Sequence, residues 1–81
     1  MDGTEVRERL ACGHEVVIAP GVRVFNHYDM GFGVVTRVGE DSPVEGRWHD
    51  VRSEGATYWP EGRSSILDAS RLTCVACGVA R

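Results

Sequence analysis

The stretch Gly21-Val22-Arg23-Val24-Phe25, followed after a polar loop by Gly31-Phe32-Gly33-Val34-Val35, decides the fold. In the first segment apolar residues alternate with other residues at a period of two, which is the pattern of a β-strand with one buried face. The second segment opens the next strand, over residues 32–38. Gly33 inside that strand predicts either a β-bulge or a close approach of another part of the chain.

Further strands are predicted on the C-terminal side of this pair. Residues 47–52, around Trp48 and Val51, and residues 63–67 each read as a short strand. An acidic turn at residues 39–43 precedes the first of them, and a longer loop at residues 53–62 separates the two.

The flanking segments are shorter. Residues 68–72 fit a single helical or 3₁₀ turn. On the N-terminal side, residues 4–11 admit a short helix, or a strand that turns at Cys12-Gly13-His14 into a second strand at residues 15–19. We favour the hairpin, because no segment of the chain sustains the apolar periodicity of a helix. We therefore predict an all-β fold.

Length and charge restrict the function. The chain has 81 residues, the size of one small domain. It contains nine arginines and twelve acidic residues, which give a net charge of −3. A general nucleic-acid binder needs a positive excess, so we expect nucleic acid to bind only weakly. The polar N-terminal stretch lacks the apolar core of a signal peptide, and no apolar run approaches the roughly 20 residues that cross a bilayer. We expect a single cytoplasmic domain over residues 1–81, with no membrane contact.

The strand pattern resembles the small SH3-like and Tudor-like barrels. Those modules combine a G-x-x-V first strand, here from Gly21, with a G-x-G-x-V second strand from Gly31 and an L-x-x-x-x-L exit, here Leu67 to Leu72. The resemblance covers about residues 21–73 and implies a partly open β-barrel. Similar modules occur in bacterial transcription-associated factors and at the ends of some helicases. The resemblance implies a binding module more than an enzyme.

The three cysteines lie in two tight-turn motifs at opposite ends of the chain. Cys12-Gly13-His14 offers a thiolate and an imidazole, and Cys74-Val75-Ala76-Cys77-Gly78 has the C-x-x-C-G form of a zinc knuckle. Three cysteines and one histidine make a closed tetrahedral set that is typical of structural zinc. We predict one zinc ion per chain, bound by Cys12, His14, Cys74 and Cys77. The ion would clamp residues 10–16 to residues 72–78, and so tie the N-terminal hairpin to the C-terminal tail.

Alternatives to this assignment stay open. His27 or His49 can replace His14 as the fourth ligand. A redox C-x-x-C pair normally opens a helix within a βαβ unit, and a catalytic zinc keeps one coordination position for water. Neither condition is met by this pattern, so we expect no catalytic residues.

Tyr28, Tyr58 and Trp59 lie in predicted loops that can converge beside Trp48 of the strand 47–52, and these four aromatic residues are the predicted partner-binding surface. Neighbouring residues of an extended segment face opposite ways, so Trp59 is predicted to contact the partner while Tyr58 covers the core. Arg47, Arg52, Arg63 and Arg71 would add positive charge to one face, among interspersed acidic residues.

These features predict a non-enzymatic, zinc-stabilised binding module whose partner is another protein, in a setting such as a transcription or nucleic-acid-processing complex. A small nucleic-acid-binding protein is the first alternative. A zinc-dependent or thiol-dependent enzyme is the second.

Overall fold

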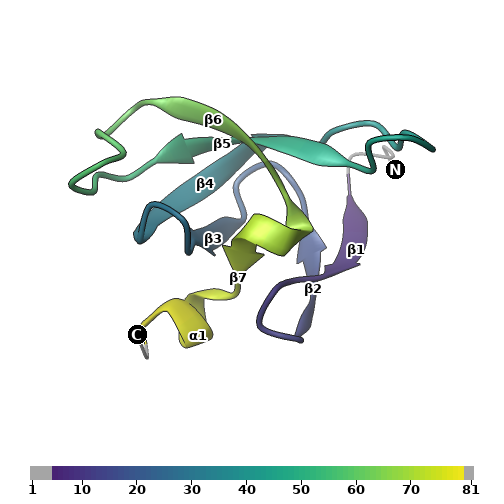
Figure 1. Cartoon of the computed structure of the whole chain (residues 1–81), viewed down its shortest axis with the longest axis horizontal. Helices are drawn as coiled ribbons and strands as arrows, with labels where there is room; N and C mark the ends of the chain where they lie inside the picture. The colour runs from purple at the N-terminus through teal and green to yellow at the C-terminus, as the bar shows by residue number, and fades with distance from the viewer. Residues whose placement is uncertain (1–4, 80–81) are drawn as a thin grey trace.

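The strands of the computed structural model, which describes residues 5–79, form two antiparallel sheets (Figure 1). The small sheet is a hairpin of β1 (Val6–Arg9) and β2 (Glu15–Ile18). The large sheet contains β3 (Arg23–Asn26), β4 (Gly31–Arg37), β5 (Trp48–Ser53), β6 (Ser64–Asp68) and β7 (Leu72–Thr73). A 3₁₀ turn, η1 (Ala69–Arg71), precedes β7, and the short helix α1 (Val75–Val79) follows it.

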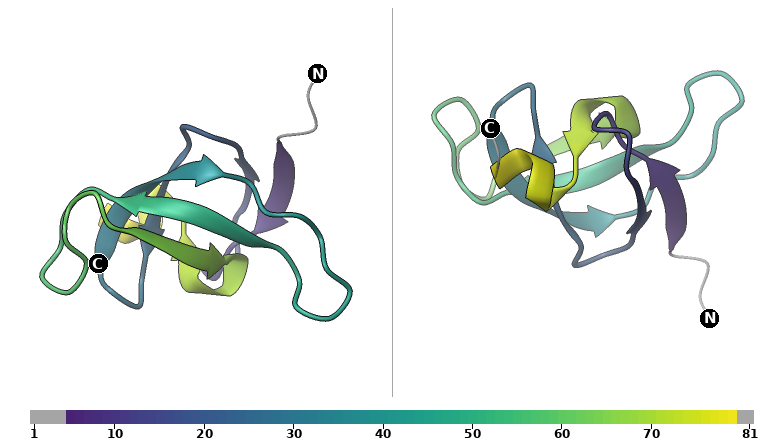
Figure 2. Two further views of the ribbon diagram at one scale, coloured as in Figure 1. Left: turned by 90° about the horizontal axis from the view of Figure 1, so that it is seen from above. Right: turned by 90° about the horizontal axis from the view of Figure 1, so that it is seen from below.

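The large sheet is a strongly curled meander. Its strand order is β6-β5-β4-β3-β7, so that after η1 the chain returns to pair β7 with the first strand of the sheet, β3. The two views of Figure 2 show the curvature and the two long loops that extend from opposite ends of the sheet. The predicted all-β fold with a partly open barrel is therefore confirmed, as is the N-terminal hairpin.

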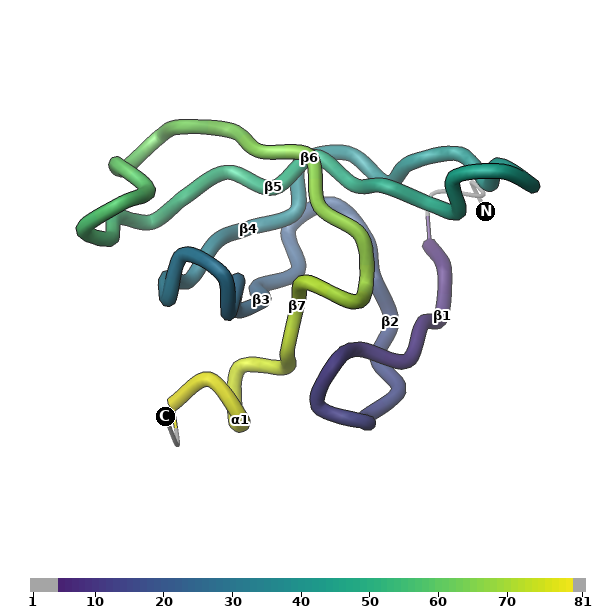
Figure 3. Tube along the Cα trace, viewed as in Figure 1, coloured from purple at the N-terminus to yellow at the C-terminus, as the bar shows by residue number. Residues whose placement is uncertain are grey.

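The hairpin covers the open side of the curled sheet (Figure 3). Leu10 and Ile18 from the hairpin are buried together with apolar residues of the large sheet. The remaining buried members of this core are Val24, Val35, Val51, Trp59, Leu67 and Leu72. The predicted strands agree with the observed ones to within one or two residues, because apolar alternation sets the buried face of each strand.

Gly33 lies where the side chains of Trp59 and Val51 come close to the backbone of β4. A Cβ atom at this position would lie 2.8 Å from the Trp59 ring and 2.8 Å from a methyl group of Val51. The β-bulge of this strand lies elsewhere, where the pairing of β4 with β5 shifts register between Val35 and Arg37.

Trp59 and Tyr58 take the opposite places from those predicted. Trp59 is only 1% exposed and packs beneath β4, whereas Tyr58 is 82% exposed. The alternation rule fails here because residues 56–59 form a tight turn, in which Ala56 and Trp59 exchange backbone hydrogen bonds of 2.9 and 3.3 Å. The Ser53 hydroxyl also donates to the Trp59 carbonyl at 2.6 Å. The prediction that Trp59 contacts a partner was therefore wrong, and so was the prediction that Tyr58 covers the core.

Truncation of these two side chains should have very different effects on stability. Trp59→Ala should lower the free energy of unfolding by about 3–5 kcal/mol, because it empties a site at the centre of a thin core. Tyr58→Ala should change it by no more than about 0.5 kcal/mol. Denaturant unfolding of the two variants measures both values, and equal effects would contradict the observed burial.

Candidate metal centre

Cys12 and His14 lie on the turn between β1 and β2. The Gly13 amide donates to the Leu10 carbonyl and the Leu10 amide donates to the His14 carbonyl, each at 2.9 Å. Gly13 has φ +90°, in the left-handed region that glycine adopts without strain. The glycine thus lets the chain reverse between the two residues and turn both side chains toward the C-terminal tail.

Cys74 and Cys77 lie on the first turn of the tail, at the start of α1 and within it. The Gly78 amide donates to the Cys74 carbonyl at 2.9 Å, which closes this turn. A Cβ atom at Gly78 would meet Phe25 of β3 at 2.6 Å. Glycine therefore follows the second cysteine because the turn packs directly on the barrel.

Backbone contacts bring the two motifs together. The Ala11 amide donates to the Leu72 carbonyl at 2.8 Å, which ties the hairpin turn to β7. Two residues further along the tail, the Cys74 amide donates to Cys12 Sγ at 3.4 Å. The predicted joining of hairpin and tail is thus present in the fold.

The four side chains form one compact cluster. Their ligand atoms all lie within 4.8 Å of one another. Cys12 Sγ lies 3.7 Å from Cys74 Sγ, and His14 Nδ1 lies 3.4 Å from the sulfurs of both Cys74 and Cys77. In a tetrahedral zinc site with ordinary bond lengths, sulfurs are about 3.8 Å apart and sulfur and nitrogen about 3.6 Å apart. The cluster can therefore hold a metal ion with little movement.

The thiols differ in how readily they lose a proton. Desolvation acts to raise the pKa of Cys12, but hydrogen bonds from the backbone of Cys74 and from His14 outweigh it and lower this pKa to about 6. A backbone hydrogen bond from Cys77 is the main cause of the lowered pKa of Cys74. The hydrogen bond to Cys74 is the main cause that raises the pKa of Cys77 to about 11, and the bond to Cys74 also raises the pKa of His14. The thiols of Cys12 and Cys74 thus lose their protons more readily than an isolated cysteine, whereas the thiol of Cys77 holds its proton more firmly.

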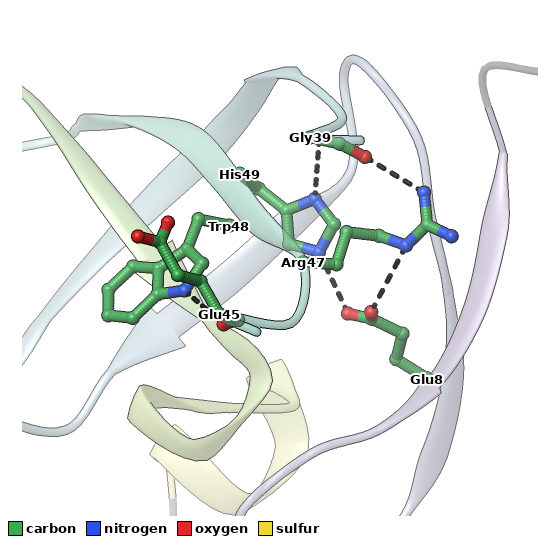
Figure 4. Close-up of polar contacts among 6 residues, drawn as sticks. All are labelled: Glu8, Gly39, Glu45, Arg47, Trp48 and His49. Carbon is green, nitrogen blue, oxygen red and sulfur yellow. Dashed lines mark hydrogen bonds and ion pairs between the residues drawn. The ribbon is translucent and has the colours of Figure 1, made fainter. Parts of the chain in front are cut away.

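His49 is not part of the cluster. It is fully buried and bonded at both ring nitrogens (Figure 4). The Gly39 amide donates to His49 Nδ1 at 3.1 Å, so the neutral ring carries its proton on Nε2, which lies 2.8 Å from Glu8 Oε1. His27 lies on the loop after β3 and also stands apart from the four ligands. Of the three histidines, the fold brings His14 to the cysteines.

Glu8 connects the hairpin to the barrel at a second place. Its other carboxylate oxygen lies 3.7 Å from Arg47 Nε, and Arg47 Nη1 donates to the Gly39 carbonyl at 2.9 Å (Figure 4). The Trp48 indole donates to the Glu45 carbonyl at 2.7 Å. These contacts order the base of the β4–β5 loop and hold β1 against it. This network could not be predicted, because Glu8 is far from its partners along the chain.

The predicted binding aromatics lie on different elements of the fold. The guanidinium carbon of Arg71 lies 5.2 Å from the centre of the Tyr28 ring and 4.8 Å from the centre of the Trp48 ring. Tyr58 stands on the β5–β6 loop. The contacts of Arg71 with these two rings were not predicted, since nothing in the sequence places η1 next to Tyr28 and Trp48.

Two of the four arginines of the predicted positive face form ion pairs in the described structure. Arg47 pairs with Glu8, and Arg71 pairs with Asp68 at 3.1 Å. Arg23 and Arg37 elsewhere on the sheet also form ion pairs, with Glu54 and Asp50. The surface of the described residues is thus one of mixed charge.

Comparison with protein-family models, with curated proteins and with solved structures finds no match to this chain. Within residues 5–79, the helices are too short to span a lipid bilayer.

The pKa values of the cluster predict how metal binding responds to pH. A bound ion needs deprotonated thiols and a neutral imidazole, so it must displace the proton of Cys77 near neutral pH and also that of Cys12 below about pH 6. Affinity should therefore fall as the pH is lowered, and fall more steeply in mild acid. Competition titrations with a chromogenic chelator at several pH values measure this slope; an affinity independent of pH would show that the thiols are not ligands.

Proposed function

We propose that this protein is a non-enzymatic, zinc-stabilised binding module that contacts another protein. The observation that carries the proposal is the meeting of Cys12, His14, Cys74 and Cys77 from the two ends of the described chain. Three sulfurs and one nitrogen favour zinc over the oxygen-preferring metals. A set of four protein ligands fills the tetrahedron and leaves no position for a catalytic water, so the ion would be structural.

The clamp is well suited to stabilising so small a domain. Cys12 and Cys74 are separated by 62 positions in the sequence. Closing a flexible loop of that length costs roughly 3–4 kcal/mol, whereas structural zinc contributes about 10–16 kcal/mol of apparent binding free energy near neutral pH. One ion thus offsets the cost of joining hairpin and tail severalfold. The reducing conditions of the cytoplasm would keep the three thiols available as ligands.

The binding surface is proposed at the end of the barrel where two loops lie side by side. The Glu54 amide donates to the Phe32 carbonyl at 2.9 Å, and a Cβ atom at Gly31 would touch Ala56. The largest exposed apolar side chains of these loops are Tyr28, Met30 and Tyr58.

Both loops hold their exposed residues in fixed positions. The buried Trp59 anchors the turn that carries Tyr58. Met30 has φ +57°, a left-handed conformation that costs a non-glycine residue of order 1 kcal/mol. Large apolar side chains presented on ordered loops are typical of a surface that contacts a partner.

The charge distribution favours a protein partner over nucleic acid. The net charge is −3, and Arg47 and Arg71 of the predicted basic face are already engaged in ion pairs. Phosphate contacts need free arginines to displace counterions. A transcription or nucleic-acid-processing complex is the setting that we propose for such a module, with protein as the direct contact.

The zinc assignment predicts a linked loss of metal and stability. Protein purified without chelator should contain one zinc per chain by elemental analysis. Cys77→Ser should lose the ion and unfold at a much lower temperature, because the three ligands that remain do not complete the tetrahedral site. Val79→Ser changes an exposed side chain of the same short helix and is the matched control. It should keep both the bound zinc and the wild-type melting temperature. Absence of stoichiometric metal from the wild-type protein would refute the assignment.

The surface assignment predicts that Tyr58→Ala weakens partner binding by about tenfold or more while leaving the melting temperature unchanged. Ile66→Ala is the matched control, because Ile66 is also an exposed apolar residue but lies on β6. Quantitative mass spectrometry of proteins retained by the three immobilised forms should reveal one that is lost only with Tyr58→Ala. Retention of oligonucleotides alone, with steep salt dependence, would favour the nucleic-acid alternative.

A further inference from the structure

Cys12 and Cys74 lie close enough to form a disulfide as well as to share a metal ion. Their sulfurs are 3.7 Å apart, and the amide of Cys74 donates directly to Cys12 Sγ. The hydrogen bond from the Ala11 amide to the Leu72 carbonyl holds the backbone of the hairpin turn against the backbone of the tail, next to the two cysteines. A disulfide needs its Cα atoms within about 7 Å and its sulfurs about 2.05 Å apart. With one sulfur already against the other residue's amide, side-chain rotation can supply the remaining approach.

The cluster lies at the surface. All three cysteines are half-buried and His14 is exposed, so a small oxidant can reach the sulfurs from solvent. A C-x-x-C pair joins residues of a single turn. Cys12 and Cys74 instead join the hairpin to the tail, 62 positions apart.

We propose that Cys12 and Cys74 are an oxidation site, at which a hydroperoxide replaces the metal clamp with a disulfide that keeps hairpin and tail joined. The proposal rests on the zinc assignment for the reduced state, whereas the disulfide itself does not depend on metal. The hairpin and the tail would then be joined in two different states of the module, by the metal ion in the reduced state and by the disulfide in the oxidised state.

The chemistry needs only the peroxide as co-reactant. One thiolate attacks a peroxide oxygen, the O–O bond breaks, and a sulfenic acid and hydroxide form. The second thiolate attacks the sulfenic sulfur, the S–S bond forms, and a second hydroxide leaves. The two sulfurs lose two electrons in total and the two peroxide oxygens gain them. A metal ion in the site would retain only His14 and Cys77 and would be released.

The fold favours this pairing over Cys74 with Cys77. A disulfide stabilises a fold mainly by restricting the unfolded chain, and the restriction grows with the length of the loop that it closes. The Cys12–Cys74 bridge closes almost the whole described chain, whereas a Cys74–Cys77 bridge closes one turn and adds no covalent link to the hairpin. Oxidation to the long-range bridge should therefore stabilise the fold more than oxidation to the Cys74–Cys77 bridge.

Peptide mapping of the oxidised wild-type protein tests the pairing. Trypsin cleaves after Arg9, Arg23 and Arg71, so Cys12 lies in peptide 10–23 and both Cys74 and Cys77 lie in peptide 72–81. After treatment with hydrogen peroxide, non-reducing digestion should yield the two peptides joined, with fragmentation placing the bond at Cys74. An internal bridge within peptide 72–81 would overturn the proposal.

The Cys77→Ser variant tests the effect on stability without metal. In the presence of chelator, peroxide should remove both remaining thiols and raise its melting temperature by roughly 10 °C or more, reversibly with a reductant. Cys12→Ser is the matched control, because its remaining pair bridges one turn and should give no comparable rise. Oxidised Cys77→Ser that melts no higher, or forms only intermolecular dimers, would overturn the proposal. A lack of zinc in the reduced wild-type protein would instead refute the zinc assignment and leave these measurements unaffected.

Discussion

The docking of the N-terminal hairpin onto β7 is the constraint on which the rest of this structure depends. A five-stranded curled sheet of this size has one open side, and the short β7 alone cannot cover it. The hydrogen bond from Ala11 to Leu72 fixes the hairpin there, and burial of Leu10 and Ile18 completes the core. Because small domains bury little apolar surface, loss of this contact would expose a large share of the core.

Two polar clusters hold the docked hairpin, one at its turn and one along its first strand. The Cys/His cluster joins the turn to the tail. Glu8, on β1, reaches His49 and Arg47, which in turn hold Gly39 at the base of the β4–β5 loop. The hairpin is thus attached at two separated places, which fixes its orientation as well as its position.

Much of the fold could be predicted because its information is local. Alternating valines define the strands of the large sheet. Gly33 indicated that another part of the chain comes close at this position, and the structure places the Trp59 ring there. The four metal-cluster residues were also predictable, since thiols and imidazole in two tight turns have few other uses. Trp59 itself was misplaced, because the residues around it form a turn in which period-two alternation does not apply. The burial of His49 and the stacking of Arg71 depend on tertiary contacts between distant residues, for which the sequence carries no periodic signal.

The junction of hairpin and tail also bears on the order in which the molecule assembles. Strands β3 to β6 each pair with their neighbour in the sequence, so each pairing closes far less chain than the junction does and can form sooner. The junction joins segments at the two extremes of the described chain and carries the largest loop-closure entropy. We therefore expect the meander to form first and the hairpin to dock last. In the chain before docking, each half of the cluster offers only two ligands, so the complete coordination set arises in the final step. Incorporation of the ion would then proceed at the rate of chain folding, and the encounter between ion and protein would not limit it.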